Sequence, residues 1–127
     1  MAILLVDDEK PLLALLQRYL ERAGYEVDVS ETGFGALAKC RARPCPYSVA
    51  VLDLKLPDIH GAELLPMLLE SSPSLKVLVA SGTPYSPQGL PAAQRQRVRA
   101  LLKPFVPKEL LEAIRQLGEQ GRVASVH

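Results

Sequence analysis

Three aspartates, one serine and one lysine stand where apolar stretches of the sequence end. They are Asp7, Asp8, Asp53, Ser81 and Lys103. If they converge, the three carboxylates would repel one another unless a positive charge lies among them, and one lysine cannot balance three. Carboxylate oxygens at an exposed mouth suit Mg²⁺ or Mn²⁺, which keep waters that phosphate oxygens can replace. The residues therefore predict a divalent cation site suited to phosphoryl chemistry.

Five segments with the pattern of strands position these residues. The segments are 2–6, 25–29, 48–54, 75–82 and 99–103. Short continuous apolar runs are typical of strands buried on both faces of a parallel sheet, whereas 25–29 alternates like a strand at a sheet edge. The candidate residues lie at the carboxyl ends of four of these strands.

Helical periodicity fills the intervals between the strands. The predicted helices cover residues 11–23, 32–43, 64–69 and 107–117. Pro11 and Pro107 stand where a first helical turn tolerates proline, and Gly24 and Gly118 are expected to end the first and last helices. Residues 83–98 carry three prolines, so any helix there is expected to be short and to begin late.

This alternation predicts an α/β fold, a three-layer sandwich around a five-stranded parallel sheet. Each crossover is long enough to return the chain to the same edge, and right-handed crossovers place helices on both faces. Ligands of such sheets bind beyond the carboxyl ends of the strands, near the point where the strand order reverses. We therefore expect the candidate residues to share one crevice.

Length and composition fit one globular domain. The chain has 127 residues, of which 48% are hydrophobic and 23% are charged. Its net charge of +1 is too small to favour binding to nucleic acid. Arginines cluster at 41–43 and 95–99 and are expected on solvated faces. No apolar run reaches the roughly 18 residues of a membrane span, and Ala2–Val6 is too short for a signal peptide. We expect a cytoplasmic protein that binds neither nucleic acid nor membrane.

The cysteines and histidines do not predict a zinc site. Cys40 and Cys45 are the only cysteines, and His60 and His127 lie far from them in sequence. We interpret the cysteines as two thiols around the end of a helix, with a redox pair as the alternative. His60 lies in a loop and is assigned no function.

Four motifs in order resemble the receiver domains of two-component response regulators. They are "LLVDDE" at 4–9, "VLDLKLPDIHG" at 51–61, "VASG" at 79–82 and "LLKPF" at 101–105. The resemblance covers residues 2 to 117, and it is specific because all four motifs occur in the same order as in the family. It implies the flavodoxin-like doubly wound fold with strand order 2-1-3-4-5. It also implies a phosphoacceptor signalling domain rather than an enzyme, whose partners are a histidine kinase or phosphotransfer protein and an unidentified effector.

The resemblance also implies a role for each candidate. Asp53 would take a phosphoryl group from a phosphohistidine and form an acyl phosphate. Asp8, Asp53 and the backbone carbonyl of Lys55 would bind Mg²⁺, with Asp7 supporting the ion through water. The other two side chains would contact the phosphoryl oxygens, namely Ser81 by a hydrogen bond and Lys103 by its charge.

Each candidate also has a structural alternative when it is considered alone, and for Asp53 this alternative is a loop-capping aspartate. Asp7 or Asp8 would be stabilised at the N-terminus of the helix that begins near Lys10. Ser81, in an "SG" turn, would simply be a turn residue, and Lys103 a surface lysine.

The sequence departs from the receiver pattern in three places. Ala100 stands three positions before the lysine, where receivers commonly carry an aromatic residue that couples to the hydroxyl residue. The usual switch between the hydroxyl and the aromatic residue is therefore absent as such. The proline-rich segment 83–98 replaces a regular helix that belongs to the common partner surface. Lys55 places a cation at the rim and is expected to change the lifetime of the acyl phosphate.

Two other classes remain as alternatives. An aspartate-nucleophile phosphatase would carry a second acid two positions after the nucleophile, where Lys55 stands. A mononucleotide-binding flavodoxin-like module would need a hydroxyl- and glycine-rich loop after the first strand, where Asp7, Asp8 and Glu9 would repel phosphate.

We expect a receiver domain at residues 1–118 and a tail or linker at 119–127. The chain would be a stand-alone receiver, or a receiver domain from a hybrid sensor histidine kinase or larger regulator.

Overall fold

Five parallel strands form a single sheet in the order β2-β1-β3-β4-β5, as predicted. The computed structural model describes residues 2–42 and 45–126, so Arg43 and His127 lie outside the described residues. The strands are β1 (Ala2–Val6), β2 (Glu26–Ser30), β3 (Tyr47–Asp53), β4 (Lys76–Ser81) and β5 (Val98–Leu102). The order reverses at β1, so the crevice of this fold is expected between β1 and β3.

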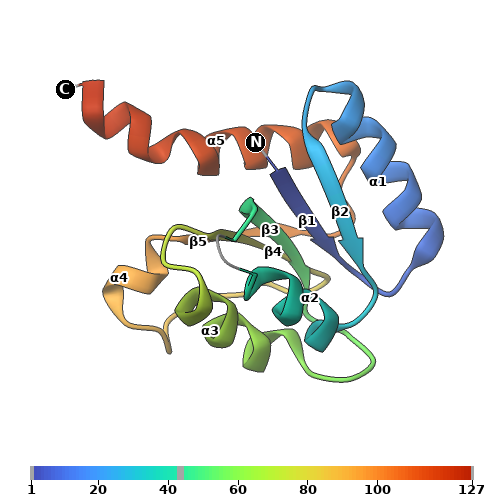
Figure 1. Cartoon of the computed structure of the whole chain (residues 1–127), viewed down its shortest axis with the longest axis horizontal. Helices are drawn as coiled ribbons and strands as arrows, with labels where there is room; N and C mark the ends of the chain where they lie inside the picture. Colours follow the sequence, from blue (N-terminus) through green and yellow to red (C-terminus); the bar gives the residue numbers. More distant parts are fainter. Residues whose placement is uncertain (1, 43–44, 127) are drawn as a thin grey trace.

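The helices cover both faces of the sheet and give the predicted three layers. They are α1 (Lys10–Arg22), α2 (Gly33–Cys40), α3 (Gly61–Ser71), α4 (Ala92–Arg95) and α5 (Pro107–Val126). Figure 1 shows α1 and α5 on one side of the sheet and α2 and α3 on the other. The single turn of α4 confirms that the proline-rich segment supports only a short, late helix.

Local sequence signals explain where the helices begin and end. Pro11 lies in the first turn of α1, and Gly24 follows it with a φ of +100°, which glycine adopts without strain. The hydroxyl of Thr32 accepts a hydrogen bond from Gly35 N at 3.1 Å and caps α2.

Two apolar clusters lie on opposite faces of the sheet. One joins β1, β3 and β4 to α2 and α3, and the other joins the same strands to α1 and α5. β1 and β4 bury all but their first residue, because helices cover both of their faces. β5 lies at the edge and is only half-buried or exposed along its length.

The last helix differs from its prediction. α5 continues through Gly118 to Val126, so the predicted end at Gly118 is wrong. A glycine inside a helix costs about 1 kcal/mol relative to alanine, which does not by itself end a helix. The proposed domain boundary at 118 stays a prediction.

Arg97 was predicted on a solvated face, and this prediction is also wrong. Its Nε donates to Leu75 O at 3.0 Å, and its Nη2 donates to Leu69 O at 3.0 Å and Ser72 O at 2.5 Å. Burial lowers the pKa of the guanidinium. Arg97 therefore satisfies carbonyls at the end of α3 and before β4.

The thiols lie where the sequence predicted, around the end of α2. Cys40 is buried and Cys45 is half-buried. Burial raises the pKa of Cys40 to about 12, so its thiolate is scarcely populated at neutral pH.

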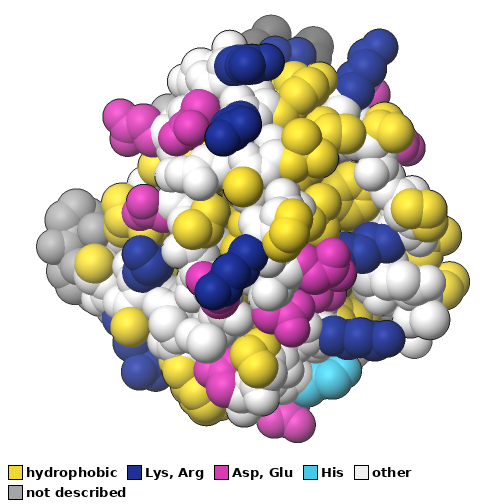
Figure 2. Space-filling view, turned by 90° about the vertical axis from the view of Figure 1, so that its right-hand side faces the viewer, with side chains coloured by type: hydrophobic (Ala, Val, Ile, Leu, Met, Phe, Trp, Pro, Cys, Tyr) yellow, Lys and Arg dark blue, Asp and Glu magenta, His cyan; other side chains and the backbone are white. Residues whose placement is uncertain are grey.

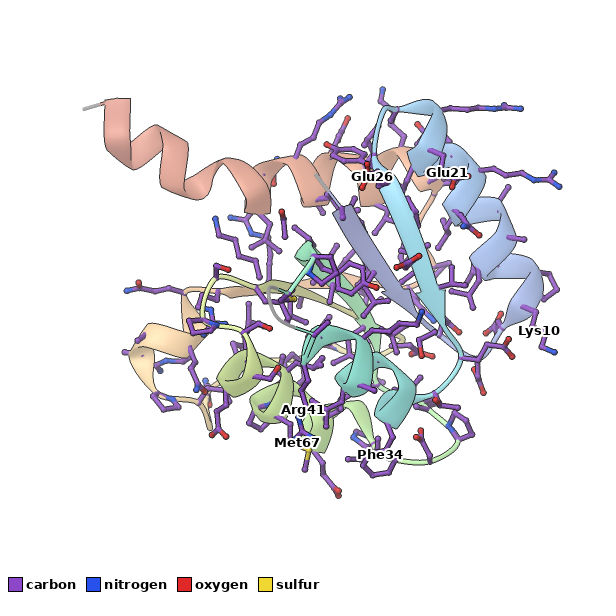
Figure 3. All side chains as sticks on the ribbon, viewed as in Figure 1. Lys10, Glu21, Glu26, Phe34, Arg41 and Met67 are labelled. Carbon is purple, nitrogen blue, oxygen red and sulfur yellow. The ribbon has the colours of Figure 1, made fainter. Side chains whose placement is uncertain are left out.

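The surface carries isolated apolar side chains. Phe34 and Met67 are 53% and 40% exposed, and Figure 3 shows them at the outer side of the layer that contains α2 and α3.

Within residues 2–42 and 45–126, no helix is both long and apolar enough to span a membrane.

Candidate functional site

The carboxyl ends of β1, β3, β4 and β5 bring the five predicted residues together at one edge of the sheet. Asp7 and Asp8 follow β1, Asp53 and Ser81 end β3 and β4, and Lys103 follows β5. A cavity of about 580 Å³ opens there. Its lining comprises Asp8, Glu9, Asp53, Leu54, Lys55, His60, Ser81, Gly82, Thr83 and Lys103. Figure 2 shows acidic side chains gathered on this face between Lys or Arg side chains.

Three carboxylates and one ammonium group form the centre of the site. Asp7 and Asp53 are each 7% exposed, whereas Asp8 is exposed, and the three offer oxygens that all lie within 4.8 Å of one another. Lys103 Nζ lies 3.3 Å from Asp7 Oδ2 and 3.6 Å from Asp53 Oδ1. One ammonium therefore pairs with the two buried carboxylates, and the third carboxylate faces the cavity.

Burial and neighbouring charges act in opposite directions on these groups. Burial and the charge of Asp7 raise the pKa of Asp53 above its usual value, although Lys103 and the backbone N–H of Lys55 oppose the shift. Burial alone would lower the pKa of Lys103, but the charges of Asp7 and Asp53 outweigh it and raise that pKa. The site therefore holds more negative charge than Lys103 offsets.

This donor set fits a hard divalent cation. The three aspartates offer carboxylate oxygens as ligand atoms, and the carboxylate of Asp8 faces the cavity. Among the described residues, no thiol or imidazole belongs to this cluster. Mg²⁺ prefers such oxygen ligands and keeps several waters. Of the three clustered aspartates, Asp8 and Asp53 line the cavity, whereas Asp7 is not among its lining residues.

Ser81 also lines the cavity. Thr83 N donates to Ser81 Oγ at 3.2 Å, and the two hydroxyl oxygens lie 3.5 Å apart. Ser81 is therefore both a turn residue and a lining residue, and its two interpretations are compatible. Thr83 lines the same cavity and was not predicted from the sequence.

Glycine and a carboxylate fix the loop between β3 and α3. Gly61 N donates to Leu54 O at 2.8 Å, and a Cβ atom at Gly61 would lie only 2.8 Å from the carbonyl oxygen of Asp53. Asp58 accepts from Gly33 N at 2.8 Å and Phe34 N at 2.9 Å. The N–H of Phe34 lowers the pKa of Asp58, and burial opposes this only in part. The loop after Asp53 is thus tied to the N-terminus of α2.

Sequence reasoning missed two residues of this loop. Asp58 binds backbone groups 24 and 25 positions away, so no local signal marks it. His60, which was assigned no function, lines the cavity and accepts a hydrogen bond from Ala62 N at the start of α3. His60 is the N-cap residue of α3, but the sequence predicted this helix only from residue 64, so the capping position was not recognised.

Comparison with known proteins identifies this arrangement. The profile of the response regulator receiver domain family matches residues 3–115. This chain belongs to that family. Its sequence is 31% identical over 118 residues to the photosynthetic apparatus regulatory protein RegA of Rhodovulum sulfidophilum, covering 93% of this chain and 63% of that protein. The receiver domain thus spans less than two thirds of the length of that curated relative.

Solved structures share the fold. The crystal structure of a CheY-like receiver domain protein from Methanospirillum hungatei is 32% identical, with a TM-score of 0.81 over 95% of this chain and 96% of that chain. Response regulator TrrA from Thermotoga maritima, crystallised in complex with Mg²⁺-BeF, is 28% identical, with a TM-score of 0.75 over 91% of this chain and 97% of that chain. The flavodoxin-like fold inferred from the motifs is confirmed.

Membership fixes the class of function. Receiver domains are signalling domains of two-component systems that bind Mg²⁺ at an acidic pocket and interact with histidine kinases and effectors. The phosphatase and mononucleotide-binding alternatives are set aside by the family match.

The departures from the usual receiver pattern are visible in the structure. Ala100 is exposed on the edge strand β5. A second cavity of about 220 Å³ adjoins it, lined by Ser81, Thr83, Pro84, Tyr85, Ala100, Leu101 and Leu102. The space beside the site hydroxyls is therefore open in this receiver.

Proposed function

We propose that Asp53 accepts a phosphoryl group from a phosphohistidine of a histidine kinase or phosphotransfer protein in the cytoplasm. The observation that supports this role is the position of Asp53, whose carboxylate lies 3.6 Å from Lys103 Nζ and lines the cavity beside Asp8. The resulting acyl phosphate would change the contacts around Ser81 and signal to an effector.

The side chains divide the chemistry among them. An Asp53 oxygen forms the bond to phosphorus as the bond from phosphorus to the donor imidazole breaks. Lys103 neutralises one phosphoryl oxygen, and the Ser81 hydroxyl donates to another. Asp7 keeps the ammonium group in place through its 3.3 Å contact.

Asp8, Asp53 and the backbone carbonyl of Lys55 would hold Mg²⁺, or Mn²⁺ in its place. When bound, the ion offsets the charge of the carboxylates and of the transferred group. Lys55 N lies 3.4 Å from Asp53 Oδ1, so the backbone of Lys55 lies close to the carboxylate, which supports its carbonyl as the third ligand.

Acetyl phosphate with Mg²⁺, followed by intact mass measurement, tests this function. The wild type is expected to gain one phosphoryl group, and excess EDTA is expected to abolish the gain. Asp53→Ala should gain none, whereas Glu112→Ala, an exposed acid of α5, should match the wild type. A phosphoryl group that persists on Asp53→Ala would contradict the assignment.

The wider context of the domain is also a proposal. A stand-alone receiver would signal through contacts with a separate effector, whereas a receiver of a hybrid sensor kinase or larger regulator would act on attached domains. The length of the gene that encodes this chain distinguishes these arrangements.

A further inference from the structure

His60 lies at the mouth of the cavity, and the function proposed above gives it no role. The backbone that follows it returns onto the end of β3, where Gly61 N donates to Leu54 O at 2.8 Å. Only glycine fits at position 61, because a Cβ atom there would lie 2.6 Å from Leu54 Cα. The loop therefore holds His60 beside the strand end that carries Asp53.

The hydrogen bond to α3 determines which nitrogen of His60 carries the proton. Nδ1 accepts from Ala62 N at 3.1 Å, so Nδ1 must keep its lone pair and the neutral ring carries its proton on Nε2. One ring carbon separates Nε2 from Nδ1, and the Nε2–H points away from the bond to Ala62. The histidine therefore caps the helix with one nitrogen and offers an N–H donor with the other.

The other donors to a phosphoryl group come from different elements. Ser81 comes from β4 and Lys103 follows β5, whereas His60 reaches the cavity from the start of α3. We propose that the Nε2–H of His60 donates a hydrogen bond to the phosphoryl group on Asp53 and covers it against water. This proposal rests on the phosphoacceptor function of Asp53.

The hydrogen bond stabilises the acyl phosphate more than the transition state of its hydrolysis, because the ring that donates it also covers the path of the attacking water. In hydrolysis, a water oxygen bonds to phosphorus, the bond from phosphorus to the Asp53 oxygen breaks, and the carboxylate, inorganic phosphate and a proton are released. Removing the ring lowers the free-energy barrier to hydrolysis, because the acyl phosphate loses a stabilising contact and the mouth of the cavity opens to water. The phosphoryl group is then lost faster.

Two substitutions separate the phosphoryl contact from the helix cap. Asparagine and aspartate are strong N-cap residues, so His60→Asn and His60→Asp keep an acceptor for Ala62 N but lack the ring donor. Each protein is phosphorylated with acetyl phosphate and Mg²⁺, the donor is removed, and the remaining phosphoprotein is followed by intact mass. Thermal unfolding of the same samples shows whether the cap of α3 is still formed.

We expect both variants to lose the phosphoryl group roughly 2- to 10-fold faster than the wild type, the range of one net hydrogen bond. The ³¹P resonance of the acyl phosphate should also move in His60→Asn. Glu63→Gln, which alters the first turn of α3 outside the cavity lining, is expected to change neither quantity. If one His60 variant loses thermal stability, the rate of phosphoryl loss from the other variant tests the proposal.

Loss rates and ³¹P resonances equal to those of the wild type in both variants would overturn the role of His60, while phosphorylation of Asp53 itself would stand. Slower loss would overturn it as well. A wild type that gains no phosphoryl group would instead remove the function assigned to Asp53, and the role of His60 with it.

Discussion

Asp53 combines the two requirements of the site in one side chain, because it must be buried at a strand end and yet carry a charge. Burial and Asp7 disfavour its ionised form, and Lys103 compensates only in part. Lys103 is shared with Asp7, which explains why one ammonium group is insufficient. Without a bound cation, the ionised carboxylate should therefore destabilise the fold.

Asp53→Asn is expected to raise the melting temperature of the metal-free protein at pH 7. The pKa of Asp53 in the folded state lies above its usual value of 3.8, so the folded state binds this proton more tightly than the unfolded state. Stability from this group is therefore present below the unfolded pKa and is lost as pH rises through the folded pKa. The advantage of the variant should be present at pH 7 and shrink toward pH 3.

Thermal unfolding in EDTA between pH 3 and pH 7 measures this difference. Glu112→Gln, at an exposed position of α5, is the control and should follow the wild type throughout. A variant that melts at or below the wild type at pH 7 would show that Lys103 offsets the charge fully.

Residues at strand ends were predictable, whereas residues that act through returning loops were not. Asp53, Ser81 and Lys103 each end or follow a recognisable apolar run, and a parallel sheet must bring such ends together. The contact of His60 with the cavity depends instead on the path of the loop, and the contact of Asp58 depends on the position of α2.

At the scale of elements, Arg97 connects the segment before β5 to α3 and to β4. It lies between α4 and β5, and its guanidinium donates to carbonyls at the end of α3 and immediately before β4. Its own carbonyl accepts from Val77 N in β4 at 2.9 Å. A single-turn α4 offers little packing of its own, so this arginine fixes how the segment before β5 meets α3.

Arg97→Met is expected to destabilise the domain by about 2–3 kcal/mol, because hydrogen bonds from a charged donor contribute about 1.5–3 kcal/mol and buried carbonyls lose their partner. Urea unfolding measures the change. Arg95→Met is the matched control, since Arg95 is exposed on α4, and it should stay within about 0.5 kcal/mol of the wild type. Equal effects of the two substitutions would mean that the Arg97 hydrogen bonds do not stabilise the fold.

Periodicity in the sequence predicted the type of nearly every element. It predicted neither the hydrogen bonds of Arg97 nor the end of α5. Arg97 occurs in a run of alternating arginines that is typical of a solvated surface, and only the position of the α3 carbonyls distinguishes it from Arg95. Gly118 has the sequence signature of a helix end, but the cost of one glycine is small beside the hydrogen bonds that continue the helix.

At the scale of the molecule, the two apolar clusters define what the domain needs to fold. α5 contributes buried side chains to one of them, and the last of these among the described side chains is Leu117. Lys76 Nζ also donates to Leu117 O at 2.9 Å, which ties the start of β4 to this point of α5. The contacts that join α5 to the sheet thus reach as far as Leu117.

Truncation after Gly118 tests the predicted domain boundary. We expect the shortened chain to stay within about 0.5 kcal/mol of the full chain, as for changes away from the core, and to gain a phosphoryl group from acetyl phosphate equally well. Leu117→Ala in the full chain is the comparison, because Leu117 is fully buried and its truncation should cost about 2–5 kcal/mol. If the truncation costs as much as Leu117→Ala in urea unfolding, the helix beyond Gly118 belongs to the folded domain and the boundary at 118 is wrong.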